Sequence, residues 1–188
     1  MSRSLSLAAV TAVLLLITPA SAAEKSLSKE HKFLKKFAGT WECASDCRMA
    51  EGQPPMKTRA TSTNRMIGDF WVMNEIVSSG GGAAVTAIQT IGFDEKKKKF
   101  HGTWIDSMVN HLWSYEGTLN DEGTILTMEA EGPNFMTGEG TAQFRDIYEF
   151  KSDNHILARS LVKGETGKWV EVVKGESKRV AEHEAKQP

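Results

Sequence analysis

The chain has 188 residues and a formal net charge of −1 at pH 7, so neither a nucleic acid nor an anionic membrane surface is indicated as a partner. Its length fits one domain with a sizeable core rather than several.

The first 22 residues have the three-part layout of a secretory signal peptide. Arg3 lies in a short polar start, residues 5–18 are apolar, and Ala20-Ser21-Ala22 is a small-x-small cleavage site. We therefore expect a periplasmic or secreted protein with no membrane segment after cleavage; an uncleaved N-terminal anchor is the alternative.

This divides the chain into a signal peptide at 1–22, a single domain at 23–180 and a frayed polar tail at 181–188. Within the domain, Ser28 is a candidate N-cap for a short helix that carries the apolar stripe Phe33, Leu34 and Phe37. Gly39 ends that helix.

From Thr40 onward, strand-like segments alternate with turn residues, and no segment is long enough for a crossover helix. This pattern predicts an all-β antiparallel meander that closes into a barrel or splits into two packed sheets. Ten strands are expected, at 40–49, 57–67, 70–79, 84–93, 99–107, 110–119, 123–131, 141–150, 154–163 and 168–178.

Two hairpins can be read residue by residue from period-two alternation. In the first, Phe93 pairs with Phe100, which sets Gln89 opposite Trp104. The second is expected to have a tight turn with Met108 and Val109 at its tip. Behind that turn the expected pairs are Asp106 with His111, Trp104 with Trp113, and Gly102 with Tyr115.

One face of these strands is rich in aromatic residues, and we take it as the barrel interior. The leading hypothesis is a binding site for a small apolar or amphiphilic molecule. Its candidate residues are Phe93, Phe100, Trp104, Asp106, His111, Trp113 and Tyr115.

Two alternatives remain open. Asp106 could orient His111 for acid-base catalysis, although no catalytic residue is assigned and no nucleophile lies in an elbow context. A barrel filled by its own side chains could instead act through its surface. The oligomeric state is left open.

The cysteines at 43 and 47 are four residues apart. In an extended strand their Cα atoms would lie about 13 Å apart, too far for a disulfide, so a bridge needs a turn at residues 44–46. No metal site is expected, because neither cysteine has zinc-ligand spacing to other cysteines or histidines.

Gly39-Thr40-Trp41 resembles the start of the first strand in lipocalins and other calycins, where the Trp packs at the closed end against a basic residue from the last strand. Lys178 and Arg179 are the candidates for that residue here. A relative of these barrels, nitrobindin, holds haem through a late His; His155 is the only such candidate, and no cofactor is expected.

The likeness extends over nearly the whole mature chain. RMIGDFWV (65–72), IGFDEKKKKFHGTWIDSM (91–108), EGTLNDEGTILTMEAEGP (116–133) and FRDIYEF (144–150) resemble the secreted bacterial family called domain of unknown function fifteen seventy-nine. Trp104, Asp106 and Ser107 are the most specific part. The resemblance implies a calycin-like barrel and export, and it implies no particular activity.

Overall fold

A computed structural model describes residues 27–48, 53–79 and 84–181 of the chain. The predicted signal peptide lies outside the described residues, as does the predicted tail except for residue 181. Among the described residues, no helix is both long and apolar enough to cross a bilayer.

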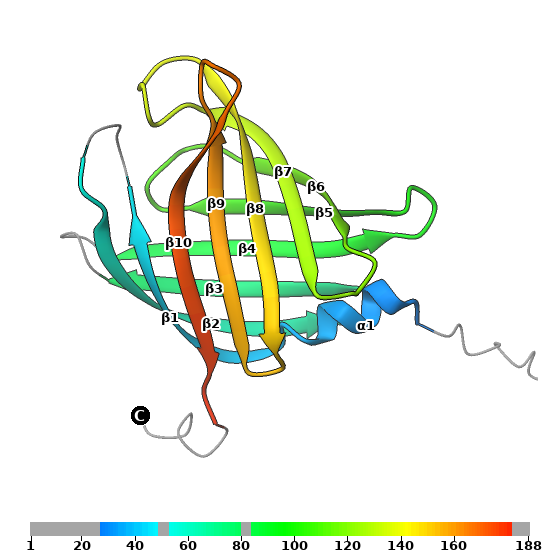
Figure 1. Ribbon diagram of the computed structural model, residues 1–188. Coiled ribbons are helices and arrows are strands. Elements are labelled where there is room, and N and C mark those ends of the chain that lie inside the picture. Colours follow the sequence, from blue (N-terminus) through cyan, green and yellow to red (C-terminus); the bar gives the residue numbers. More distant parts are fainter. Residues whose placement is uncertain (1–26, 49–52, 80–83, 182–188) are drawn as a thin grey trace, which may run out of the picture.

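The described chain folds into one short helix and ten strands (Figure 1). Each strand pairs antiparallel with its neighbours in the chain, and β10 pairs with β1, so the sheet closes into a barrel. The elements are α1 Lys29–Lys35, β1 Gly39–Cys47, β2 Met56–Ile67, β3 Trp71–Ser79, β4 Val85–Asp94, β5 Lys99–Asp106, β6 Trp113–Leu119, β7 Ile125–Pro133, β8 Thr141–Ser152, β9 His155–Lys163 and β10 Trp169–Arg179.

This confirms the predicted all-β fold, and closure leaves no unpaired edge among the ten described strands. The largest difference at a strand boundary is in β6, which begins at Trp113 rather than at residue 110. Side chains alternate between the inner and outer faces along the strands, except where the register shifts at residues 171–173 of β10 and 150–152 of β8. In β8, for example, Phe144 and Phe150 are buried on the inner face.

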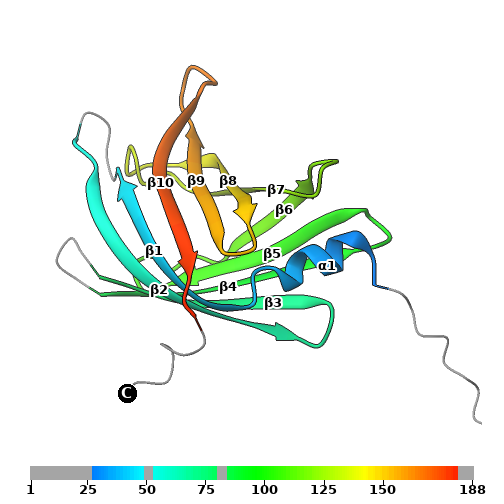
Figure 2. The ribbon, with the colours of Figure 1, turned by 60° about the horizontal axis from the view of Figure 1, so that its bottom comes forward.

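The two ends of the barrel differ. We call one the helix end: it carries the turns at 68–70, 95–98, 120–124 and 153–154, and α1 lies there (Figures 1 and 2). Lys35 of α1 pairs with Asp69 at 2.7 Å, and Lys36 pairs with Asp153 at 3.7 Å, so the helix is held to two of these turns. The other end, with loops 107–112, 134–140 and 164–168, is called the loop end.

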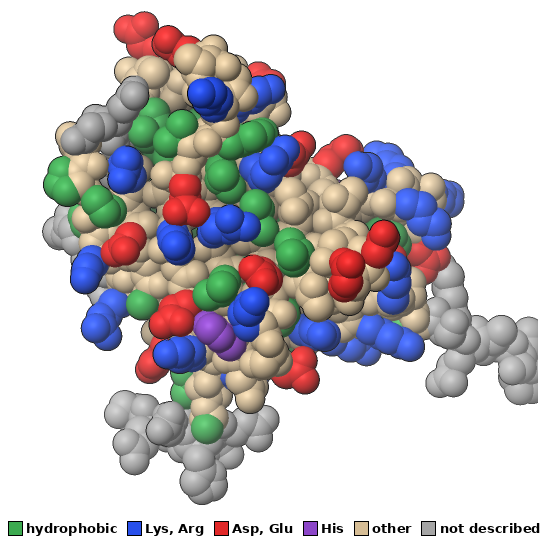
Figure 3. Space-filling model, viewed as in Figure 1, with side chains coloured by type: hydrophobic (Ala, Val, Ile, Leu, Met, Phe, Trp, Pro, Cys, Tyr) green, Lys and Arg blue, Asp and Glu red, His purple; other side chains and the backbone are tan. Residues whose placement is uncertain are grey.

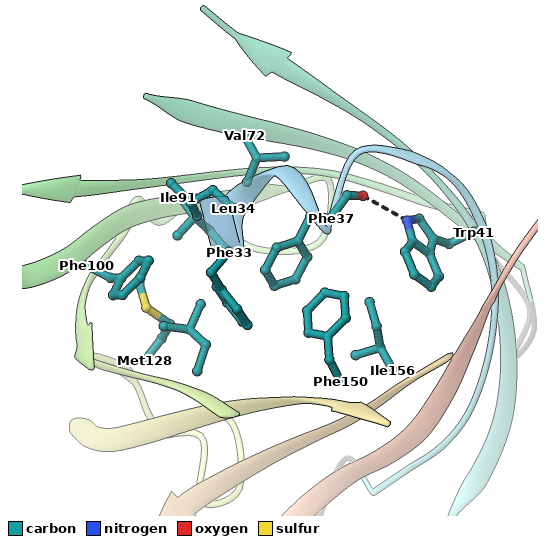
Figure 4. Close-up of a cluster of buried hydrophobic side chains, with 11 residues drawn as sticks. Phe33, Leu34, Phe37, Trp41, Val72, Ile91, Phe100, Met128, Phe150 and Ile156 are labelled. Carbon is teal, nitrogen blue, oxygen red and sulfur yellow. Dashed lines mark hydrogen bonds between the residues drawn. The ribbon is translucent and has the colours of Figure 1, made fainter. Parts of the chain in front are cut away.

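The predicted helix starts at the predicted cap, since the Ser28 side chain accepts a hydrogen bond from the backbone N–H of His31. Its apolar stripe points into the barrel and packs on inward side chains from seven strands (Figure 4). This core comprises Phe33, Leu34, Phe37, Trp41, Val72, Ile91, Phe100, Leu126, Met128, Phe150 and Ile156.

The last carbonyls of the helical segment all find donors. Phe37 O accepts from Trp41 Nε1 at 2.8 Å and from Asn64 Nδ2 at 3.0 Å. Arg179 donates to Lys36 O at 2.8 Å and to Ala38 O, and its guanidinium lies 4.2 Å from the centre of the Trp41 ring. The expected packing of Trp41 against a basic residue of the last strand is therefore present, and Arg179 makes it.

The outer face seen in Figure 3 mixes acidic, basic and scattered apolar side chains without a large area of one sign. On the outer face of β8, Arg145 pairs with Glu129 and lies 4.1 Å from the centre of the Trp169 ring.

Candidate ligand-binding lumen

The seven candidate residues lie in three places rather than in one site. Phe93 and Phe100 contact each other, with ring centres 5.0 Å apart, inside the helix-end core. Trp104, Trp113 and Tyr115 lie on the inner face nearer the loop end. The remaining two, Asp106 and His111, are at the rim of the loop end.

The register of the first hairpin is as predicted, with Phe93 opposite Phe100 and Gln89 opposite Trp104. In the second hairpin, Trp104 does pair with Trp113 and Gly102 with Tyr115. The predicted tight turn is wrong, however, because the ladder ends at Trp104 and Trp113 and residues 107–112 form a longer loop.

The side chain of Asp106 explains the longer loop. Its Oδ1 accepts from the backbone N–H groups of Met108 at 2.7 Å and Val109 at 3.0 Å, which holds the chain in a turn in place of the ladder. Its Oδ2 accepts from Trp104 Nε1 at 2.8 Å. His111 packs edge-on against Trp113, and no hydrogen bond or ion pair joins it to Asp106 in the described part of the chain.

At the loop end, strands β6 to β10 form an apolar inner wall. Trp113 is 8% exposed, its ring lies directly over Gly132, and its edge meets Phe144 with ring centres 4.9 Å apart. Ala130, Val162 and Val172 complete the buried cluster, with Trp104, Tyr115 and Met136 partly buried against it.

The adjoining inner wall, from β1 and β2, carries small and polar side chains. The inward positions are Cys43, Ser45, Cys47, Thr58 and Ala60, all partly accessible. Both cysteines are free, and β1 runs extended through Cys47, so residues 44–46 make no turn. Burial raises the pKa of the Cys43 thiol, an effect partly offset by a hydrogen bond from Ser177.

Between the helix-end core and the loop end, polar side chains bridge the lumen. Asn74 Nδ2 of β3 donates to Gln89 Oε1 of β4 at 2.9 Å, and Gln89 Nε2 donates to Tyr148 Oη of β8 at 2.8 Å. Because β4 and β8 are separated by three strands around the barrel, the second bond crosses the interior. Asn74 is 3% exposed, and its Oδ1 has no hydrogen-bond partner among the residues that the structure describes.

Asp146 lies beside this bridge, two residues before Tyr148 on the same inner face of β8. Its Oδ1 accepts from Ser160 Oγ at 2.5 Å, and the Tyr115 hydroxyl also hydrogen-bonds to the carboxyl group. Desolvation by burial raises the pKa of Asp146, and these two hydrogen bonds oppose the rise. Burial and the nearby acid also raise the pKa of Tyr115, which stays protonated as a donor.

Sequence reasoning did not select Asn74, Gln89, Asp146, Tyr148 or Ser160. The signal for Asp146 was present in FRDIYEF, where it alternates in phase with Phe144, Tyr148 and Phe150. His155, the haem candidate, is next to buried Ile156 in β9 and therefore faces outward, away from the lumen. Its Nε2 lies 3.1 Å from Glu176 Oε2 on β10. No group of three or more metal-binding side chains occurs in the described ranges.

A closed antiparallel barrel with a helix at one end and an aromatic and polar interior is a calycin-like architecture. The family described as "Protein of unknown function (DUF1579)" matches residues 26–179, and the chain belongs to this family. A search of curated proteins finds no significant match.

Several solved structures are similar. The S-type phycobiliprotein lyase CPES from Guillardia theta has a TM-score of 0.55 and 11% identity, covering 83% of this chain and 94% of that one. EF1p2_mFAP2b bound to DFHBI has a TM-score of 0.45 and 8% identity, covering 80% and 98%. A redesigned β-barrel, mFAP0, bound to DFHBI has a TM-score of 0.40 and 10% identity, and the match covers 77% of this chain and 99% of that one. At such identities the likeness to the lyase supports the barrel fold and nothing about a reaction.

Proposed function

We propose that this protein is exported and binds a small apolar or amphiphilic molecule inside the barrel. One observation carries the proposal: Trp104, Tyr115, Asp146 and Ser160 face inward yet keep accessible surface. Side chains that were fully interdigitated would have none, as at the helix end, where Phe100 and Leu126 are 1% and 0% exposed.

The two inner walls support an amphiphilic ligand rather than a purely apolar one. Trp104, Tyr115 and Met136 are partly accessible and offer apolar contact on one side, and Ser45 and Thr58 offer hydroxyl groups on the other. Ligand sites typically combine such apolar lining with a few placed polar groups.

The rim of the loop end is also apolar. Met108 and Leu112 are each 59% exposed, and Phe135 is 37% exposed while its ring stacks on inward-facing Phe144. An apolar molecule entering from this end would meet Phe135, whose ring leads to the inner face through its contact with Phe144. Acid-base chemistry at Asp106 and His111 gains no such support, because the carboxylate is occupied by Trp104 and the loop backbone.

A matched pair of variants tests the proposal. Ala60 faces the lumen from β2 and pairs with two small residues, Cys43 and Ser78, whereas Thr61 next to it is exposed on the outer face. Ala60→Phe should fill the lumen, and Thr61→Phe should leave it unchanged.

The probe is N-phenyl-1-naphthylamine, an uncharged fluorescent apolar molecule, titrated into the purified protein. We expect the wild type and Thr61→Phe to bind it and Ala60→Phe to lose binding with little loss of stability. If the lumen is instead already filled, the wild type will not bind the probe. Ala60→Phe will then overpack the interior and cost about 1–3 kcal/mol, as the surface-acting alternative requires.

A further inference from the structure

The acidic group in the lumen has no cationic partner. Among the described residues, Asp146 forms no ion pair, and its hydrogen-bond donors are the neutral hydroxyls of Ser160 and Tyr115. Arg145 is next in sequence but lies on the outer face, where it pairs with Glu129. The inward positions around Asp146 on the adjacent strands are Met128 of β7 and Ser160 of β9, neither of which is basic.

A second, independent observation points to the same ligand chemistry. Asn74 Oδ1 is buried on the inner face without a donor, at the far end of the bridge that reaches Tyr148. An amide oxygen left in this state costs free energy unless a donor reaches it.

The accessibility of Asp146 is consistent with a cavity wall. Its carboxyl group is enclosed enough for desolvation to raise its pKa, yet the residue keeps accessible surface. Both features are expected of a side chain that borders a small space inside the barrel. The lumen therefore has acceptors at mid-depth and apolar walls toward the loop end.

We propose that the ligand carries an N–H donor group, best a protonated amine, which binds Asp146 while its apolar part lies along the partly accessible rings of Trp104 and Tyr115. This inference rests on the proposed function and specifies its ligand class. A carboxylate ligand is disfavoured, because it would place a second negative charge beside Asp146 without a basic side chain to pair with it. A charge-assisted hydrogen bond in an enclosed site is stronger than one between neutral groups.

Three probes of equal chain length separate the head group from the tail: dodecylammonium, dodecanol and dodecanoate. Each is measured at pH 7 by displacement of N-phenyl-1-naphthylamine from the wild type. We expect dodecylammonium to bind about tenfold or more tightly than dodecanol, the order expected for one charge-assisted hydrogen bond, and dodecanoate to bind most weakly.

Asp146→Asn keeps the shape and removes the charge, and Asp121→Asn in an exposed turn is the control. The affinities of Asp146→Asn for dodecylammonium and dodecanol should lie within about twofold of each other. The affinities of Asp121→Asn should match those of the wild type. Equal or tighter binding of dodecanoate by the wild type would overturn the inference while leaving the proposed function intact. Unchanged selectivity in Asp146→Asn would do the same. Failure of all three probes and of the fluorescent molecule to bind would overturn both.

Discussion

Truncating Trp113 to Ala should strongly destabilise the barrel, and the structure indicates how much. The ring is 8% exposed and packs on Gly132, which has no side chain to move into the space left behind. Phe144, on the other side, is itself held by Phe135. The void should therefore persist, and a loss of ~3–5 kcal/mol is expected for a buried aromatic cut to Ala.

In a thermal melt followed by far-ultraviolet circular dichroism, this loss corresponds to a drop of roughly 6–20 °C, since each kcal/mol moves the midpoint by about 2–4 °C in a domain of this size. Trp71→Ala is the control. Trp71 is 37% exposed and stacks on His101 with ring centres 4.8 Å apart, so its removal should cost about 1–2 kcal/mol.

A double-mutant cycle tests the stated cause. Gly132→Ala alone should destabilise by about 1–3 kcal/mol, because its Cβ would overlap the Trp113 ring. In the Trp113→Ala background the same change should be neutral or stabilising, because the added methyl fills part of the void. The packing of Trp113 against Gly132 would be refuted if Trp113→Ala lowered the melting temperature by less than about 4 °C. It would also be refuted if the effects of the two substitutions were additive. Either result would mean that one side of the Trp113 ring faces empty space.

Three further predictions follow from single features of the chain. Both Cys43 and Cys47 should be titratable with a thiol reagent after denaturation without reductant, and a mass lower by two hydrogens would contradict the extended β1. The pKa of Asp146 is higher in the folded protein than in the unfolded chain, where it lies near the ordinary value of about 4. The protonated Asp146 side chain therefore stabilises the fold fully below about pH 4, and this stabilisation is lost as pH rises through the folded pKa. Asp146→Asn should thus gain melting temperature relative to the wild type between pH 4 and pH 7; a constant difference would count against a desolvated carboxyl group. Intact-mass measurement of the exported protein should give an N-terminus at Ala23 or within a residue or two, and retention of Met1 would disprove cleavage.

The sequence was sufficient for features that depend on local pattern. Period-two alternation set the pairing of Phe93 with Phe100 and of Trp104 with Trp113, and an N-cap rule located the helix start at Ser28. The hairpin loop after Asp106 was not predictable from alternation, because a side-chain acceptor there competes with the ladder for backbone N–H groups.

The polar bridge depends on closure, which no local pattern encodes. Gln89 and Tyr148 are 59 residues apart in sequence and meet only because the barrel brings β4 opposite β8. The phase of Asp146 with its aromatic neighbours did place it on the inner face, but nothing in the sequence indicated which donors would surround it. The candidate site is consequently centred on β3, β4 and β8 as well as on the aromatic hairpins.

The claim that the lumen holds a ligand is tested most directly by native mass spectrometry of the protein purified without detergent. One spectrum is recorded from the protein as purified. A second is recorded after the protein has been unfolded in denaturant, passed over a hydrophobic resin that removes the ligand, and refolded. We expect the first to show an added mass that collisional activation removes as a small molecule, and the second to show the chain alone, which regains mass on addition of dodecylammonium. A chain mass without adduct in both spectra, and no uptake of dodecylammonium or dodecanol, would contradict the account.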